Sequence, residues 1–162
     1  MRSQFEKPGV DGVRALPSQH VRPSDYRLDD QIGFLLRRAH QRHTAIFHEL
    51  MLEGLTPTQF AAVAKLREAG PLSQNLLGRE TAMDSATIKG VVSRLRDRGI
   101  VESVHDDGDR RRLIVALTPE GRRLSNRCIK VAARISELTV APLDPAERAA
   151  IIKLLDRIAD GD

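Results

Sequence analysis

The sequence has very little cysteine. Cys128 is the single cysteine, so the chain cannot form an internal disulfide or a thiolate metal cluster. No apolar run approaches the roughly 20 residues that a membrane span needs. The first residues contain Arg and Lys without an apolar segment, which does not match a secretory signal. These absences predict a cytoplasmic protein that makes no contact with a membrane.

Motifs of enzyme active sites are also missing. The sequence contains no Gly-rich phosphate loop, no nucleophile elbow and no metal-ligand motif. We therefore expect no enzyme, no catalytic residues, no bound metal and no cofactor. The net charge of +4, from 26 Lys and Arg against 22 Asp and Glu, is common among soluble proteins. The net charge is therefore only weak evidence for nucleic-acid binding. The distribution of the charged residues along the chain is the better guide.

The first third of the chain consists of two segments that differ in composition and periodicity. Residues 1–25 combine proline, glycine and scattered charge without a period, which predicts a flexible arm. Apolar residues then recur at helical spacing and predict one long amphipathic helix over residues 28–52, ended by Gly54.

Capping residues predict three further helices in quick succession. Thr56 and Gln59 form a capping box around Pro57, and Ser73 is placed to cap a short helix. Asp84 caps the next helix, which Gly99 ends. The helix capped by Ser73 and the helix capped by Asp84 are joined by so short a link that they must cross at a steep angle.

The helix after Asp84 has one apolar and one polar face. The apolar face consists of Ile88, Val91, Val92 and Leu95. The outer and flanking positions are Ser85, Ala86, Lys89, Gly90, Ser93 and Arg94. Glycine costs about 1 kcal/mol relative to alanine inside a helix. Gly90 therefore indicates a close approach to the backbone, either by DNA or by a neighbouring helix.

A β-hairpin follows, with residues 100–104 and 112–117 as strands around an Asp-Asp-Gly-Asp tip. Thr118 and Asp144 then cap two C-terminal helices. The predicted fold is mainly α with a small β-hairpin. Residues 1–25 form the arm, 26–54 a dimerisation helix, 55–118 a winged helix-turn-helix and 119–162 two more dimerisation helices. Their apolar stripes exceed what one small module covers, which favours a two-fold dimer.

Several linked motifs resemble the multiple antibiotic resistance regulator (MarR) family. The similarity includes Asp109-Arg110-Arg111 and the helix start Leu117-Thr118-Pro119-Glu120-Gly121. It extends upstream to Leu55-Thr56-Pro57-Thr58-Gln59-Phe60 and covers about residues 28–159. Within the family, His40, Arg42 and His43 make the first helix similar to repressors of aromatic-acid catabolism, including the nicotinate-pathway type.

This resemblance implies a homodimer on a pseudo-palindromic operator of double-stranded DNA. In each protomer, the helix after Asp84 would be the recognition helix and would occupy a major groove. The tip of the hairpin would be the wing tip and would occupy an adjacent minor groove. We assign five residues to base edges: Ser85, Ala86, Lys89, Gly90 and Ser93. Thr87 and Arg94 would position phosphates, and Arg110 and Arg111 would contact DNA from the wing, with Asp109 orienting one of them.

The resemblance also implies that a small aromatic acid binds between the DNA-binding lobe and the dimer helices. The candidate residues are His40, His43 and Phe47, because an imidazole beside an aromatic wall suits an aromatic carboxylate. The same histidines also suit a dimer interface or a satisfied core position.

Other interpretations stay open. One alternative is a metal-responsive regulator, based on His40, His43 and His48, although these residues do not complete a tetrahedral set of ligands. Another alternative is a redox sensor based on Cys128, but the apolar helical position of this residue favours a buried thiol. Two further alternatives are a non-specific architectural DNA-binding protein and a dimeric protein-interaction module that does not bind DNA.

Overall fold

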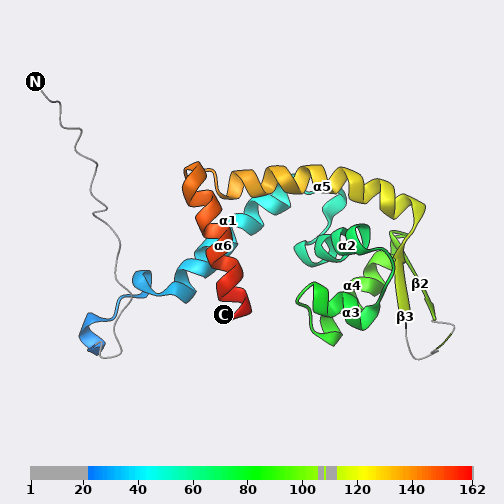
Figure 1. Cartoon of the computed structure of the whole chain (residues 1–162), viewed down its shortest axis with the longest axis horizontal. Helices are drawn as coiled ribbons and strands as arrows, with labels where there is room; N and C mark the ends of the chain where they lie inside the picture. Colours follow the sequence, from blue (N-terminus) through cyan, green and yellow to red (C-terminus); the bar gives the residue numbers. More distant parts are fainter. Residues whose placement is uncertain (1–21, 106–107, 109–112, 162) are drawn as a thin grey trace, which may run out of the picture. The chain divides into compact units, whose positions relative to one another are not determined.

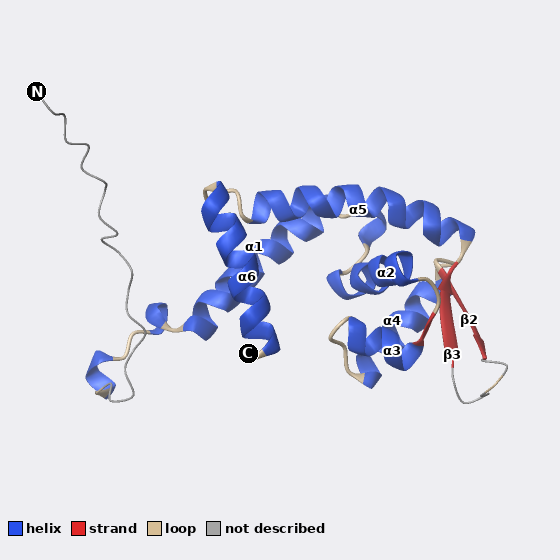
Figure 2. Cartoon of the chain, viewed as in Figure 1, coloured by secondary structure: helices blue, strands red, loops and turns tan. Residues whose placement is uncertain are grey.

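The structure is a computed structural model and describes residues 22–105, 108 and 113–161. The chain divides into two compact units, Met1–Gln41 and Arg42–Asp162. The helical elements are η1 (Pro23–Asp25), η2 (Leu28–Asp30), α1 (Ile32–Leu50), η3 (Leu52–Gly54), α2 (Pro57–Ala69), α3 (Gln74–Glu80), α4 (Ser85–Asp97), α5 (Pro119–Thr139) and α6 (Pro145–Asp160). The strands are β1 (Leu72–Ser73), β2 (Val101–His105) and β3 (Leu113–Leu117) (Figures 1 and 2).

The first long helix is shorter than the sequence predicts. Its expected first turn is the separate 3-10 turn η2, and Gln31 after it is extended, with ψ 127°. Asp29 and Asp30 explain this difference, because aspartate favours turns over helix interiors. At the other end, Met51 is extended with ψ 134°, so the helix ends before Gly54 is reached.

The predicted caps of the other helices are confirmed. Thr56 Oγ1 accepts from the Gln59 backbone N–H at 3.2 Å, and Gln59 Oε1 accepts from the Thr56 N–H at 3.0 Å. Ser73 Oγ accepts from the Leu76 N–H at 3.3 Å and begins α3. Thr118 and Asp144 likewise accept from the third helical N–H of α5 and α6. Each helix therefore starts where its own sequence satisfies otherwise unpaired donors.

The hairpin is confirmed and gains a third strand. β2 and β3 pair antiparallel, with Val101 opposite Leu117 and His105 opposite Leu113. β1 pairs with the other edge of β3, with Leu72 opposite Val115, so the strand order is β1-β3-β2. The sequence did not predict β1, because two residues carry no recognisable period.

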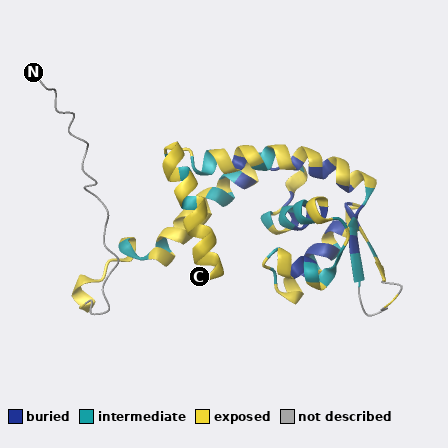
Figure 3. Cartoon of the chain, viewed as in Figure 1, coloured by how far each residue is buried: buried dark blue, intermediate teal, exposed yellow. Residues whose placement is uncertain are grey.

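One apolar core holds the second unit together. Figure 3 shows buried residues in α2, α3, α4, the strands and parts of α5, whereas α6 is exposed along most of its length. Leu66, Leu77 and Leu95 are fully buried, from α2, α3 and α4 respectively. On α5, Leu124, Cys128 and Ile135 join this core. Within the described ranges, no helix is long and apolar enough to cross a membrane.

Candidate nucleic-acid interface

The start of α4 is fixed by Asp84. Its Oδ1 accepts the Thr87 backbone N–H at 2.7 Å, and its Oδ2 accepts the Thr87 hydroxyl at 2.9 Å. The backbone hydrogen bond from Thr87, followed by the bond from its hydroxyl, lowers the pKa of Asp84 below its ordinary value. The carboxylate is therefore ionised at neutral pH, where its charge suits a helix N-terminus.

The buried side of α4 fixes which residues face outward. Ile88, Val91, Val92 and Leu95 are at most 2% exposed, as the sequence predicts. Ser85, Ala86, Lys89 and Arg94 are exposed, while Gly90 and Ser93 are half-buried. The predicted base-edge residues thus lie away from the core or at its margin. Whether they contact DNA stays a prediction.

Gly90 is not explained by packing inside the described part of the chain. A Cβ built on Gly90 would have the Arg94 guanidinium as its nearest described neighbour, at an ordinary contact distance of 3.5 Å. The three nearest described atoms all belong to the Arg94 side chain of the same helix. The absence of a side chain at Gly90 therefore leaves room for an approach from outside.

The predicted phosphate contact of Thr87 has a competitor. Because the Thr87 hydroxyl already donates to Asp84, it could donate to a phosphate only by giving up that bond. Arg94 has no such limit, since its exposed guanidinium carries five donors.

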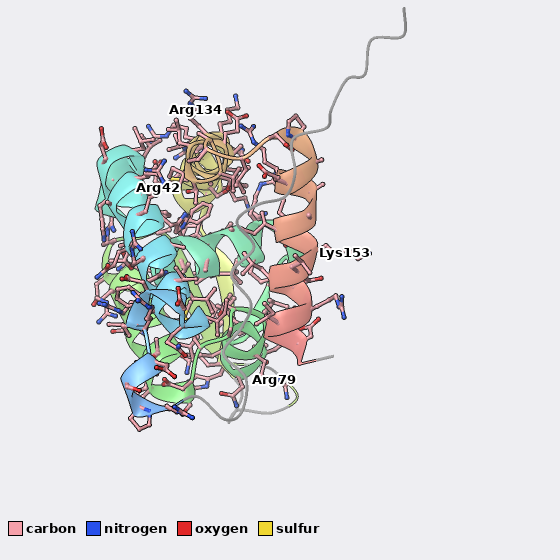
Figure 4. The ribbon with its side chains drawn as sticks, turned by 90° about the vertical axis from the view of Figure 1, so that its left-hand side faces the viewer. Arg42, Arg79, Arg134 and Lys153 are labelled. Carbon is pink, nitrogen blue, oxygen red and sulfur yellow. The ribbon has the colours of Figure 1, made fainter. Side chains whose placement is uncertain are left out.

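A hollow of about 280 Å³ adjoins the start of α4, where α3 and α4 meet. Its lining residues are Asn75, Gly78, Arg79, Met83, Ser85 and Ile88. Gly78 allows this close approach of the helices, because a Cβ there would lie 3.1 Å from both Ile88 Cγ2 and the Met83 carbonyl oxygen. Arg79 projects from α3 (Figure 4). Sequence reasoning missed Asn75 and Arg79, although a basic residue on the helix before the turn was a usable signal.

The predicted wing residues Asp109, Arg110 and Arg111 lie outside the described residues. The strands leading to them are described up to the pair His105 and Leu113.

The predicted ligand residues separate into two groups. His40 is exposed and belongs to the first unit. In the second unit, the rings of His43 and Phe47 have centroids 6.2 Å apart, and the centroids of the Phe47 and Phe60 rings are 6.0 Å apart. Phe47 is 3% exposed and is therefore also a core residue.

The contacts of His43 indicate its tautomer. Thr139 Oγ1 donates to the Ile135 carbonyl at 2.8 Å, so its oxygen accepts from His43 Nδ1 at 3.0 Å. The Nδ1 atom therefore carries a proton.

The metal and redox alternatives gain no support here. Among the described residues, no three His, Cys, Asp or Glu side chains are grouped so that they could hold an ion. Cys128 is completely buried, and this desolvation raises the pKa of its thiol despite the opposing charge of Arg127. A protonated thiol without solvent contact reacts slowly with oxidants, which favours the structural interpretation.

Comparisons with known proteins agree on one family. Residues 53–112 match the sequence model of the MarR family. The repressor NicR of Pseudomonas putida, described as an HTH-type transcriptional repressor, is 46% identical over 138 residues, covering 85% of this chain and 87% of NicR. A probable transcriptional regulator from Pseudomonas aeruginosa is 50% identical with a TM-score of 0.80, covering 82% of this chain and 99% of that structure.

A third protein adds a ligand. The structure of Bordetella bronchiseptica BpsR, whose DNA binding is regulated by 6-hydroxynicotinic acid, is 42% identical to this chain. The TM-score is 0.81, and the match covers 85% of this chain and 99% of that structure. A capped helix-turn-helix followed by a hairpin, together with these similarities over most of the sequence, shows that the chain belongs to the MarR family of DNA-binding transcriptional regulators.

Proposed function

We propose that this protein is a transcriptional repressor that binds a pseudo-palindromic operator as a homodimer and is released by a small aromatic carboxylate. The observation that carries the proposal is the orientation of α4, whose buried side turns Ser85, Ala86 and Lys89 outward in a chain 46% identical to the repressor NicR. A regulator of this kind acts in the cytoplasm and is not an enzyme.

The exposed apolar residues of the C-terminal helix support the dimer. On α6, Ile152, Leu155 and Ile158 are 67%, 43% and 57% exposed. In the first unit, Ile32, Leu35 and Leu36 are also exposed. Such surface is unfavourable in water, and a second copy of the chain would cover it. We therefore assign residues 26–54 and 119–162 to dimerisation and residues 55–118 to DNA binding.

The outward residues of α4 would read the major groove. We assign Ser85, Ala86, Lys89, Gly90 and Ser93 to base edges and Arg94 to a phosphate. Thr87 would reach a phosphate only if its bond to Asp84 is released. Arg110 and Arg111 would contact the minor groove, oriented by Asp109. We add Asn75 and Arg79, because they line the same hollow as Ser85 and offer an amide and a guanidinium to the DNA backbone.

A nicotinate-like acid is the proposed effector. His43 and Phe47 place an imidazole next to an aromatic ring, and BpsR responds to 6-hydroxynicotinic acid. The His43 imidazole would hydrogen-bond the ligand carboxylate while the ligand ring packs against aromatic side chains. The role of His40, which belongs to the first unit, stays a prediction from the sequence.

Fluorescence anisotropy on the DNA upstream of the chain's own gene tests this function. We expect tight binding that 6-hydroxynicotinic acid weakens and that hexanoic acid, a non-aromatic acid, leaves unchanged. A His43→Ala variant should keep operator binding and lose the response. His48→Ala is the matched control, since His48 is an exposed histidine on the same helix.

Three outcomes would contradict the proposal. Tight operator binding that no aromatic carboxylate weakens would show that such acids are not the effector. Equal affinity for unrelated duplexes, with a steep loss on added salt, would instead indicate an architectural DNA-binding protein. Absence of DNA binding at low salt would indicate a protein-interaction module.

A further inference from the structure

Glu53 joins three separate parts of the second unit. It lies in η3, between α1 and α2. Its backbone carbonyl accepts a hydrogen bond from Arg98 Nη2 at 2.7 Å, and its Oε1 accepts from Arg127 Nη2 at 3.2 Å. Arg98 directly follows α4, and Arg127 lies within α5. One residue thus connects the end of α4, the proposed DNA-reading helix, with α5.

The backbone conformation of Glu53 does not favour a glutamate. Its φ of 55° and ψ of 21° are left-handed, a region that residues with a Cβ avoid and glycine adopts freely. A glycine would satisfy the turn and would still offer its carbonyl to Arg98. What glutamate adds at this position is the carboxylate that holds Arg127.

The N-terminal end of α5 already holds the same joint. Thr118 Oγ1 donates to the Gly99 carbonyl at 2.7 Å, and the Thr118 N–H donates to the Ile100 carbonyl at 3.1 Å. A Cβ at Gly121 would collide with that Ile100 oxygen, so the two backbones are in close contact. Further along, Leu124, Cys128 and Ile135 pack α5 onto the core, and Arg67 Nε of α2 donates to Asn126 Oδ1 at 2.9 Å. Arg127 adds a polar contact to η3 about 13 Å along α5, at about 1.5 Å per residue, and further restricts rotation of α5 about its N-terminal end.

We propose that Glu53 is a positioning residue for operator recognition, which fixes the angle of α4 against α5 by holding Arg98 and Arg127. A dimer reads two major grooves only when its recognition helices are about 34 Å apart, so a small rotation at this joint changes the fit. The paired side chains of Glu53 and Arg127 are 52% and 57% exposed, and such pairs contribute little to stability. The effect therefore falls on DNA recognition rather than on folding.

This inference rests on the proposed operator binding, which the unmodified dimer tests first. Given that binding, Glu53→Gln should weaken operator affinity roughly three- to tenfold. Its affinity for an unrelated duplex and its melting temperature should stay unchanged.

Glu137→Gln is the matched control. It removes the same charge and breaks a pair of similar length, since Arg134 Nη1 lies 3.0 Å from Glu137 Oε2, with both side chains 63% exposed. That pair lies within α5, where Arg134 projects outward (Figure 4), and it connects no second element. Its operator affinity should equal that of the unmodified chain, and an equal loss in both variants overturns the proposal.

Two further variants separate positioning from charge and from folding. The double variant Glu53→Arg with Arg127→Glu restores the ion pair in reverse and should recover operator affinity relative to either single change; no recovery overturns the proposal. Glu53→Gly removes the carboxylate and relieves the left-handed strain, so it should melt no lower than the unmodified chain. If Glu53→Gly binds the operator as tightly as the unmodified chain, Glu53 has no positioning role.

Discussion

Replacing Gly90 with alanine should make the protein more stable and a worse DNA binder. Gly90 lies inside α4 with helical backbone angles, and alanine is favoured there by about 0.5–1 kcal/mol. The added methyl meets the Arg94 guanidinium at an ordinary 3.5 Å, so no clash offsets that gain. For a chain of this size, the gain corresponds to a rise in melting temperature of roughly 1–4 °C.

The same methyl would occupy the space through which DNA approaches the helix backbone. A poorly fitted base contact costs at least about 1 kcal/mol, which corresponds to a loss of at least about fivefold in operator affinity. Thermal melting followed by circular dichroism gives the first quantity, and anisotropy on the operator gives the second. Gly33→Ala is the control, because Gly33 is also a helical glycine with nothing within 4 Å of its Cβ position. A destabilised Gly90→Ala protein, or one with undiminished operator affinity, would refute the reasoning.

Three other changes have defined outcomes. Replacing Arg110 and Arg111 with alanine should weaken operator binding and leave the dimer intact in size-exclusion chromatography; loss of the dimer would mean that these residues are not in the wing. Asp84→Ala should lower the melting temperature at neutral pH, whereas Asp84→Asn should retain the cap. Because the pKa of Asp84 is lowered from 3.8 in the folded state, the charge-dependent part of this stabilisation is present above that value and lost as the pH falls through the folded pKa. The difference in melting temperature between the Asp84→Ala variant and the unmodified chain should therefore become smaller in acid. Cys128 should react with a maleimide only in denaturant, since burial raises the pKa of its thiol; rapid labelling of the folded chain would contradict this.

Local chemistry made most helix boundaries predictable. Caps such as Thr56 with Gln59 and Asp144 with Glu147 are hydrogen bonds over three residues, and sequence neighbours determine them. The inner face of α4 was equally predictable, because apolar spacing follows the helix period. The prediction for α1 was wrong at its start, where Asp29 and Asp30 lie in a turn rather than in the helix.

The sequence alone therefore determined the order of the elements, the winged helix-turn-helix and the outward residues of α4, since each depends on neighbours within a few positions. Only the tertiary structure paired β1 with β3, formed the hollow between Arg79 and Ser85, and brought Arg98 and Arg127 to Glu53. These two arginines are 45 and 74 positions from Glu53. Contacts over such separations depend on the path of the whole chain, and no local period or cap encodes them.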